Sequence, residues 1–117
     1  MRRLLAGLTV LAGCATTGPE SDPHYPEFLS LMEVNQAHVD ALDDEKSKEA
    51  AVSRLHTIGD NLKYARAIRP QAYGPSIEPY FDDCLKTLSE LEHEEWGRPA
   101  YRRLLNSCTR CHERPQP

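Results

Sequence analysis

Long apolar runs, an excess of positive charge and internal repeats are all missing from this sequence. None of its apolar stretches reaches the about 20 residues of a membrane-spanning helix, so a bundle of such helices is not expected. Lysine and arginine number 14 against 18 aspartates and glutamates, a formal charge of -4, whereas a general nucleic-acid binder would be basic. With 117 residues, 39% of them hydrophobic and 27% charged, the chain suits one small domain with a modest core.

Cysteine is scarce, and the spacing of the four residues speaks against most uses of cysteine pairs. Cys108 and Cys111 are the one close pair, while Cys14 and Cys84 each stand alone. A zinc ribbon needs a second pair at similar spacing, and a thioredoxin-like pair opens a helix after a strand instead of closing a helical run. A disulfide within the close pair would be strained. The four cysteines therefore do not form a disulfide framework, and each needs its own explanation.

The close pair belongs to the sequence Cys108-Thr109-Arg110-Cys111-His112, which has the Cys-x-x-Cys-His pattern of covalent haem attachment. In this motif two thiols add across the haem vinyl groups, and the following imidazole binds the iron. Residues three and four apart on a helix project from one face, so all three side chains can reach one group. We predict one covalent haem c, held by Cys108 and Cys111, with His112 as proximal iron ligand. Because five residues follow the motif, we expect the other haem contacts to come from the preceding chain.

The N-terminal residues resemble a bacterial lipoprotein signal. A pair of arginines precedes the apolar residues 4–11, as in a secretory signal. The sequence Leu11-Ala12-Gly13-Cys14 then resembles a lipobox, which implies cleavage before Cys14 and lipidation of its thiol. An ordinary signal cut at a nearby small residue is the alternative. Either interpretation exports the chain to the compartment in which bacteria attach haem covalently, so we predict a periplasmic protein, lipid-anchored to a membrane.

The remaining sequence is divided by its composition. Residues 1–13 are predicted as signal peptide, residues 14–26 as a flexible tether rich in Thr, Gly, Pro, Ser and Asp, and residues 27–117 as a four-helix domain. In this domain apolar residues recur at spacings of three and four, which is typical of amphipathic helices. Acidic, Pro-containing and Gly-containing breaks separate the predicted helices, which cover approximately residues 27–44, 46–68, 78–96 and 100–113.

Four amphipathic helices with short breaks predict an all-α fold, an up-down-up-down four-helix bundle with haem at one end. The start of the first helix and the end of the fourth then share that end. Met32 lies roughly 8 Å into the first helix, at about 1.5 Å per residue, which is close to the height of His112. Thioether sulfur is a good iron ligand, so Met32 is the leading candidate for the sixth position. An open sixth position, or ligation by His24 or Cys84, is the alternative.

Two further features concern the surroundings of the predicted haem. Residues 98–117 hold five arginines and one glutamate, a local charge of +4. This basic segment could neutralise haem propionates or attract an acidic partner, or it could simply complement the dipole at a helix end. Apolar and aromatic side chains on the helix faces that point inward are predicted to line the pocket: Phe28, Tyr80, Phe81, Cys84 and Leu105.

A haem motif at the end of a four-helix chain, with Met32 early in the first helix, resembles the class II c-type cytochromes, the cytochrome c′ group. The resemblance covers roughly residues 26–114, and its specific part is the placement of Cys108, Cys111 and His112. It implies that His112 is the proximal ligand. Members with methionine at the position of Met32 resemble six-coordinate electron carriers, whereas members with an apolar residue there are five-coordinate and bind nitric oxide or carbon monoxide.

These observations favour a lipid-anchored, periplasmic monohaem cytochrome that carries single electrons between redox partner proteins through a His/Met-ligated haem. A homodimer is compatible with this interpretation. The alternative is a five-coordinate haem protein that binds nitric oxide or carbon monoxide. The sequence offers no convergent acid–base pair, so an enzyme is not expected. A weak peroxidase-type activity would need an open sixth site, and a haem-free envelope lipoprotein is the remaining alternative.

Overall fold

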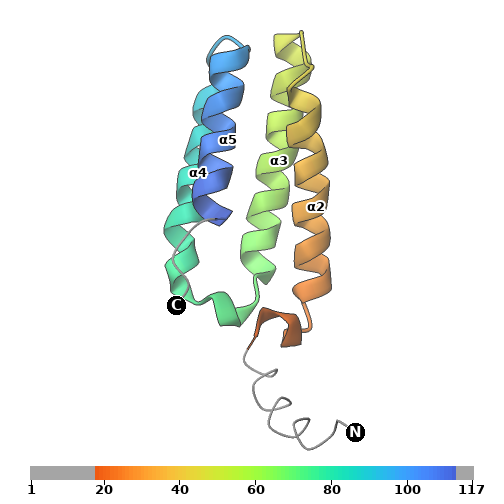
Figure 1. Ribbon diagram of the computed structural model, residues 1–117, viewed down its shortest axis with the longest axis vertical. Helices are drawn as coiled ribbons and strands as arrows, with labels where there is room; N and C mark the ends of the chain where they lie inside the picture. The colour runs from red at the N-terminus through yellow and green to blue at the C-terminus, as the bar shows by residue number, and fades with distance from the viewer. Residues whose placement is uncertain (1–17, 113–117) are drawn as a thin grey trace, which may run out of the picture.

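The computed structural model describes residues 18–112, and over this range the chain is all-helical, without strands. Figure 1 shows four long helices lying side by side. They are α2 (Tyr25–Leu42), α3 (Lys48–Ile68), α4 (Glu78–Leu91) and α5 (Arg98–His112), with the short 3-10 turns η1 (Pro19–Ser21), η2 (Gln71–Tyr73) and η3 (Pro75–Ile77). The expected all-α helical bundle is confirmed. No helix within residues 18–112 has the length and apolar character to cross a membrane.

Local sequence signals explain where these helices begin and end. The Ser47 hydroxyl accepts a hydrogen bond from the Ala50 amide at 3.2 Å, which caps the start of α3. The same helix ends at Ile68 because Pro70 disfavours helical geometry in the residue before it. Pro79 lies in the first turn of α4, where a missing amide hydrogen costs no helical bond. The third long helix ends at Leu91, earlier than the predicted boundary near Trp96.

The folded part of the chain starts before Glu27, the residue at which the sequence predicted it to begin. The turn η1 packs beside η2 and the start of α2. The Asp22 carboxylate accepts hydrogen bonds from the His24 amide at 2.8 Å and from the Gln71 amide at 3.2 Å. Residues 18–26, which fall in the predicted tether of residues 14–26, therefore close the bundle beside the α3–α4 connection. The predicted signal peptide and Cys14 lie outside the described residues.

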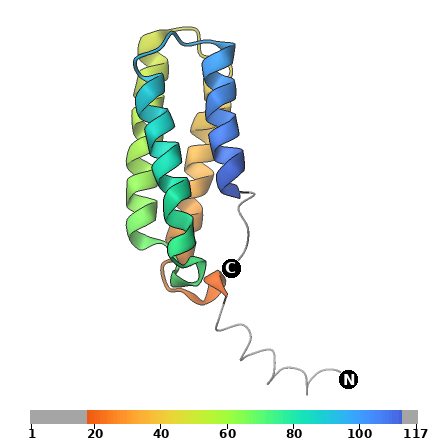
Figure 2. The ribbon, with the colours of Figure 1, turned by 90° about the vertical axis from the view of Figure 1, so that its left-hand side faces the viewer.

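Consecutive helices make most of the tertiary contacts. α2 packs on α3, α3 on α4 and α4 on α5, whereas α2 and α5 scarcely meet. The core is formed by apolar side chains from every helix and from η3: Phe28, Val39, Leu42, Ala51, Leu55, Ile58, Leu62, Ala65, Ile77, Phe81, Cys84, Leu88, Leu91, Ala100 and Leu104. At the end of the bundle where α5 begins, Arg98 lies 3.6 Å from Asp43. Figures 1 and 2 both show that α5 ends well short of the level at which α2 starts.

Candidate functional site

A hollow of about 510 Å³, including its opening to solvent, lies between all four long helices. Its walls are mainly apolar, and its lining comes from α2, α3, α4 and α5: Met32, Asn35, Gln36, Val39, Ile58, Leu62, Tyr80, Phe81, Cys84, Cys108, Cys111 and His112. The hollow is located where α2 and α5 make few contacts with each other. The gap between these two helices is therefore where a ligand would enter.

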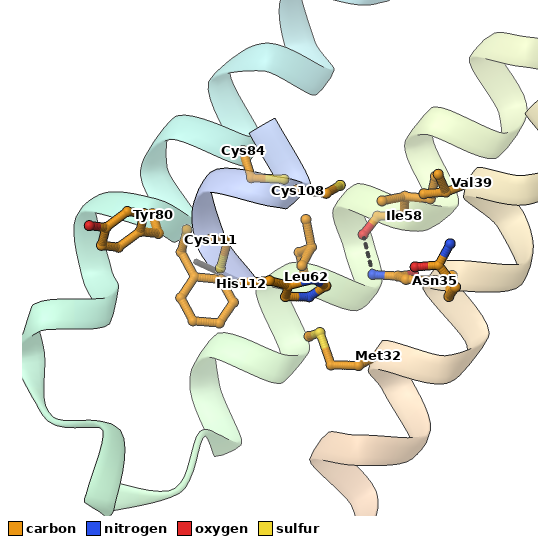
Figure 3. A pocket seen from close by; sticks show the side chains of 12 residues that line it. Met32, Asn35, Val39, Ile58, Leu62, Tyr80, Cys84, Cys108, Cys111 and His112 are labelled. Carbon is orange, nitrogen blue, oxygen red and sulfur yellow. Dashed lines mark hydrogen bonds between the residues drawn. The ribbon is translucent and has the colours of Figure 1, made fainter. Parts of the chain in front are cut away.

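The three residues of the predicted haem motif share one wall of this hollow. Cys108, Cys111 and His112 all line it from the last turn and a half of α5. The two cysteines are half-buried and His112 is exposed at the opening. Figure 3 shows the three side chains at the C-terminal end of this helix, turned to the same space. The one-face arrangement that the spacing predicted is confirmed for these residues, and it leaves their sulfur and nitrogen atoms accessible from the hollow.

Met32 lies on the opposite wall, on α2, and its side chain points toward His112 in Figure 3. Of the five histidines in the sequence, all within residues 18–112, only His112 lines the hollow. His38 is within 3.1 Å of the Arg54 guanidinium, and His56 pairs with Glu92. Met32 is therefore the side chain with a soft donor atom that faces the predicted proximal ligand across the space.

The other side chains predicted to line the pocket divide into two groups. Tyr80, Phe81 and Cys84 line the hollow from α4. Phe28 and Leu105 are not among the residues that line it. Phe28 is buried against Tyr73, with ring centroids 5.6 Å apart. On α5 the fully buried residues are Ala100, Leu104 and Ser107, and Leu105 is partly buried against the core beside them.

Asn35 is a lining residue that the sequence analysis missed. Its side chain is buried on α2, one turn from Met32. Its amide donates to the Ile58 carbonyl at 3.3 Å, and its oxygen accepts from the Asn61 amide at 3.0 Å. These bonds satisfy a polar group that would otherwise destabilise the core. The sequence signal that could have identified Asn35 is its position as a lone asparagine in an apolar stripe. A buried side-chain amide there needs hydrogen-bond partners on a neighbouring helix.

A buried hydroxyl and an ion pair fix the register of α5 on α4. The Asp83 carboxylate accepts hydrogen bonds from the Ser107 hydroxyl at 3.1 Å and from the Arg110 guanidinium at 2.6 Å. Ser107 is 1% exposed, so its hydroxyl depends on this partner. The bond from Arg110 is the main cause that holds the pKa of Asp83 below its usual value. Partial burial raises this pKa, and the bond from Ser107 lowers it further. We call these two bonds, from Ser107 and Arg110 to Asp83, the clamp. The clamp helps to set which face of α5 is turned to the hollow.

Most of the arginines described on α5 are paired with acidic side chains. Arg103 lies 2.6 Å from both Glu90 and Glu94, and Arg110 lies 2.6 Å from Asp83. These acids are on α4 or just beyond its end. The basic segment predicted at the end of the chain is therefore largely neutralised across the α4–α5 contact within residues 98–112. This pairing favours a structural role for Arg103 and Arg110 over the attraction of an acidic partner.

The chemistry of the donors fits a covalently held haem, whereas the hollow as it stands is too narrow for a porphyrin. A porphyrin supplies four nitrogen ligands itself, so the protein needs to add only one or two axial donors and the two thiols. Only about 60 Å³ of the hollow admits the centre of a water molecule, so its walls must move apart to take a flat macrocycle. The pair of walls formed by α2 and α5 can separate at low cost, because they share few contacts.

Cys84 and Cys108 form a pair of neighbouring thiols in this site. A hydrogen bond to Cys108, together with burial, raises the pKa of the Cys84 thiol. Cys84 is 5% exposed, so it stays protonated and acts as the donor of that bond. No group of three or more His, Cys, Asp or Glu side chains is arranged to chelate a metal ion in the part of the chain that the structure describes.

Comparisons with family models, with curated proteins and with solved structures found no match to this chain. The resemblance to the class II c-type cytochromes therefore rests on the motif and on the order of the helices alone.

Breaking the clamp should lower stability in a pH-dependent way. Asp83→Asn should reduce the free energy of unfolding by about 0.5–1 kcal/mol at neutral pH, the upper part of the range for exposed ion pairs, because Asp83 is 43% exposed. Since folding depresses the pKa of Asp83, its contribution is present above the unfolded-state value of 3.8 and is lost as the pH falls through the lower folded-state value. Urea unfolding at a series of pH values measures the difference.

Asp60→Asn, an exposed position on α3, is the matched control and should change the free energy of unfolding very little at any pH. A loss in Asp83→Asn that stays constant far below pH 3.8 would show that the carboxylate charge does not contribute.

Proposed function

We propose that this chain is a monohaem c-type cytochrome that carries single electrons. The observation that carries the proposal is the shared hollow: Cys108, Cys111 and His112 line one wall, and Met32 lies on the wall opposite. In this proposal the four helices run up-down-up-down and the haem is wedged between α2 and α5. When bound, haem supplies an iron that alternates between the ferric and ferrous states by one electron.

The side chains of this hollow have separate tasks in the proposal. The Cys108 and Cys111 thiols hold the haem covalently on α5, and His112 binds the iron from the same helix. Met32 approaches from α2 and binds the other axial position. Val39, Ile58 and Leu62 exclude water from the site, which favours the less charged ferrous state. Ligands from two helices that scarcely meet would tie α2 to α5, which closes the bundle.

An electron carrier fits this lining better than an enzyme does. The polar side chains of the lining, apart from those of the motif and Tyr80, are Asn35 and Gln36. Asn35 already bonds to α3 through both ends of its amide. Neither residue is an acid or base near neutral pH, so apart from Tyr80, the cysteines and His112 the lining offers no group to move protons for a bound substrate. Electron transfer needs no such group, since the partner exchanges electrons with the exposed edge of the site.

One observation supports binding of nitric oxide or carbon monoxide as a second candidate function. Met32 is only half-buried, and it lies on the wall with few contacts to α5. A thioether held on such a wall can move away from the iron and leave the sixth position to a diatomic ligand. The two functions therefore differ in whether Met32 stays bound.

The proposed location is the periplasm, with the protein anchored to a membrane through lipid on Cys14. The support is the lipobox-like sequence before Cys14 and its agreement with a haem motif that is matured outside the cytoplasm. The bundle begins beside Gly18, so an anchor on Cys14 would hold the domain close to the membrane surface. Redox partners would then be proteins that reach this surface.

Covalent haem should survive denaturation. Wild-type protein matured in a cell that attaches haem should keep its haem stain on a denaturing gel, because thioether bonds do not depend on the fold. The double variant Cys108→Ala/Cys111→Ala should lose the stain entirely. Cys84→Ala is the matched control, a cysteine of the same hollow outside the motif, and it should keep the stain. Wild-type protein that releases its haem in the gel would refute covalent attachment.

Met32 should decide between a carrier and a gas-binding protein. Met32→Leu retains the volume of the side chain and removes the sulfur, so it should convert a low-spin ferric haem into a high-spin one that binds carbon monoxide readily. The reduction potential should fall by up to a few tenths of a volt, within the about 0.8 V that axial ligands span. Absorption spectra and redox titration measure both changes.

Val39→Ala is the control for Met32→Leu, because Val39 lines the same hollow from the same helix without offering a ligand. It should leave the spin state unchanged. If wild-type protein is already high-spin and binds carbon monoxide readily, Met32 only packs and the gas-binding function replaces the electron carrier.

The lipid anchor should be visible in the mass of the mature chain. We expect residues 1–13 to be absent and Cys14 to carry the added mass of its acyl groups, because lipobox cleavage exposes a lipidated cysteine. Cys14→Ser should move the haem protein from the membrane to the soluble fraction or leave it unprocessed. An intact mass that corresponds to an unmodified cysteine would refute the anchor while leaving the haem proposal untouched.

A further inference from the structure

A third thiol faces the haem motif from the neighbouring helix. Cys84 on α4 and Cys108 on α5 line the same hollow. In Figure 3 the sulfur of Cys84 points toward Cys108. Neither residue is in a disulfide in this structure, and Cys84 is buried. The haem motif itself needs only Cys108 and Cys111, so the function proposed above does not account for Cys84.

The backbone around this pair is held in register on both sides. Asp83 precedes Cys84 on α4, and it accepts hydrogen bonds from Ser107 and Arg110, which flank Cys108 on α5. These bonds fix the two helices against sliding where the two thiols meet. A disulfide forms without strain only between residues whose β-carbons approach one another, so a fixed register that holds both thiols at the same hollow favours this pair.

The other possible pairings are less favourable. Cys108 and Cys111 lie on the same helix, three residues apart, and a disulfide between them would strain the helix. Cys111 lies almost one turn beyond Cys108 on α5, and Cys108 is the cysteine toward which the sulfur of Cys84 points in Figure 3. Cys84 thus has one well-placed partner, and that partner is the first cysteine of the motif.

We propose that Cys84 and Cys108 form a disulfide in the haem-free protein and that this bond withholds Cys108 from haem attachment. The first half of the proposal stands on the geometry of α4 and α5 alone. The second half rests on the function proposed above. Cys84 would then make haem attachment to this chain dependent on a reducing step, and it would staple α4 to α5 until that step takes place.

The chemistry balances by thiol–disulfide exchange. The thiolate of one cysteine attacks a disulfide oxidant, such as oxidised glutathione or an exported protein disulfide, and releases one thiol from it. The second cysteine then attacks the mixed disulfide and releases the other thiol. The protein loses two protons and two electrons and gains one S–S bond, and the oxidant loses its S–S bond and becomes two thiols. Haem attachment consumes the S–H of Cys108, so it needs a reductant to reverse this exchange first.

Trypsin offers a direct test, because its cleavage sites place the three cysteines in separate peptides. Cleavage after Arg66, Lys86, Arg103 and Arg110 gives residues 67–86 with Cys84, 104–110 with Cys108, and 111–117 with Cys111. The haem-free full chain is incubated folded with oxidised glutathione, blocked with N-ethylmaleimide and digested. We expect peptides 67–86 and 104–110 to appear as one linked species, lighter by two hydrogen atoms than the two reduced peptides together, which dithiothreitol separates.

Three variants make this result specific. Cys84→Ala and Cys108→Ala should each abolish the linked species, whereas Cys111→Ala should leave its yield unchanged. Cys84→Ser serves as a second variant at the buried position, and circular dichroism verifies that each variant remains helical. A link between peptides 104–110 and 111–117 in wild-type protein, or full labelling of Cys84 and Cys108 by N-ethylmaleimide, would overturn the proposed disulfide.

The second half is tested by counting haem per chain. Wild-type and Cys84→Ala proteins are matured in cells that attach haem, with and without an added thiol oxidant. We expect the oxidant to lower haem per chain several-fold in wild-type protein and to leave Cys84→Ala unchanged, with wild-type yield restored by reductant. An equal loss in both proteins would overturn the blocking role. Wild-type protein that takes no haem even under reducing conditions would instead refute the proposed function, while the peptide map still decides the disulfide.

Discussion

The contact between α4 and α5 is the constraint on which the site depends. The helix α5 carries every residue of the haem motif, and it has a sparse apolar face: only Ala100, Leu104 and Ser107 are buried along it. Tyr101, Leu105 and Cys108 add partly buried contacts with the core. The bonds from Ser107 and Arg110 to Asp83 hold α5 against α4 in one rotation about its axis. In that rotation Cys108, Cys111 and His112 line the hollow.

A second constraint is the weak contact between α2 and α5. A closed four-helix bundle would fill the space between these helices with side chains. Here α5 is short, its end does not reach the level at which α2 starts, and the hollow remains between them. Met32 and Asn35 line this space from α2, one as a soft donor and the other as a polar group tied to α3. The bundle therefore has two closely packed helix pairs, α2 with α3 and α4 with α5. Between α2 and α5 it has a gap that a flat cofactor could fill.

The same geometry explains why thiol chemistry and haem chemistry compete in our proposals. A cysteine that is to react with a haem vinyl group must face the interior of the bundle, and the interior is also where a thiol from another helix can meet it. Burial of Cys84 beside Cys108 would be unremarkable in a reducing compartment, where buried cysteine behaves as a small apolar residue. In an oxidising compartment, which the N-terminal sequence predicts, the same pair of thiols would become the redox pair that we propose.

The sequence by itself determined the helices and the shared face of the motif. Both follow from short-range rules: apolar spacing of three and four, Ser47 as a cap, Pro70 as a stop, and the one-face projection of Cys108, Cys111 and His112. Only the tertiary structure decided how each helix is rotated, because rotation depends on partners that are distant in sequence. It excluded Phe28 and Leu105 from the hollow, and it brought Asn35 to Ile58, Ser107 to Asp83 and Cys84 to Cys108. These are pairs of residues on different helices, and no local pattern specifies which residue a buried polar group or thiol will meet.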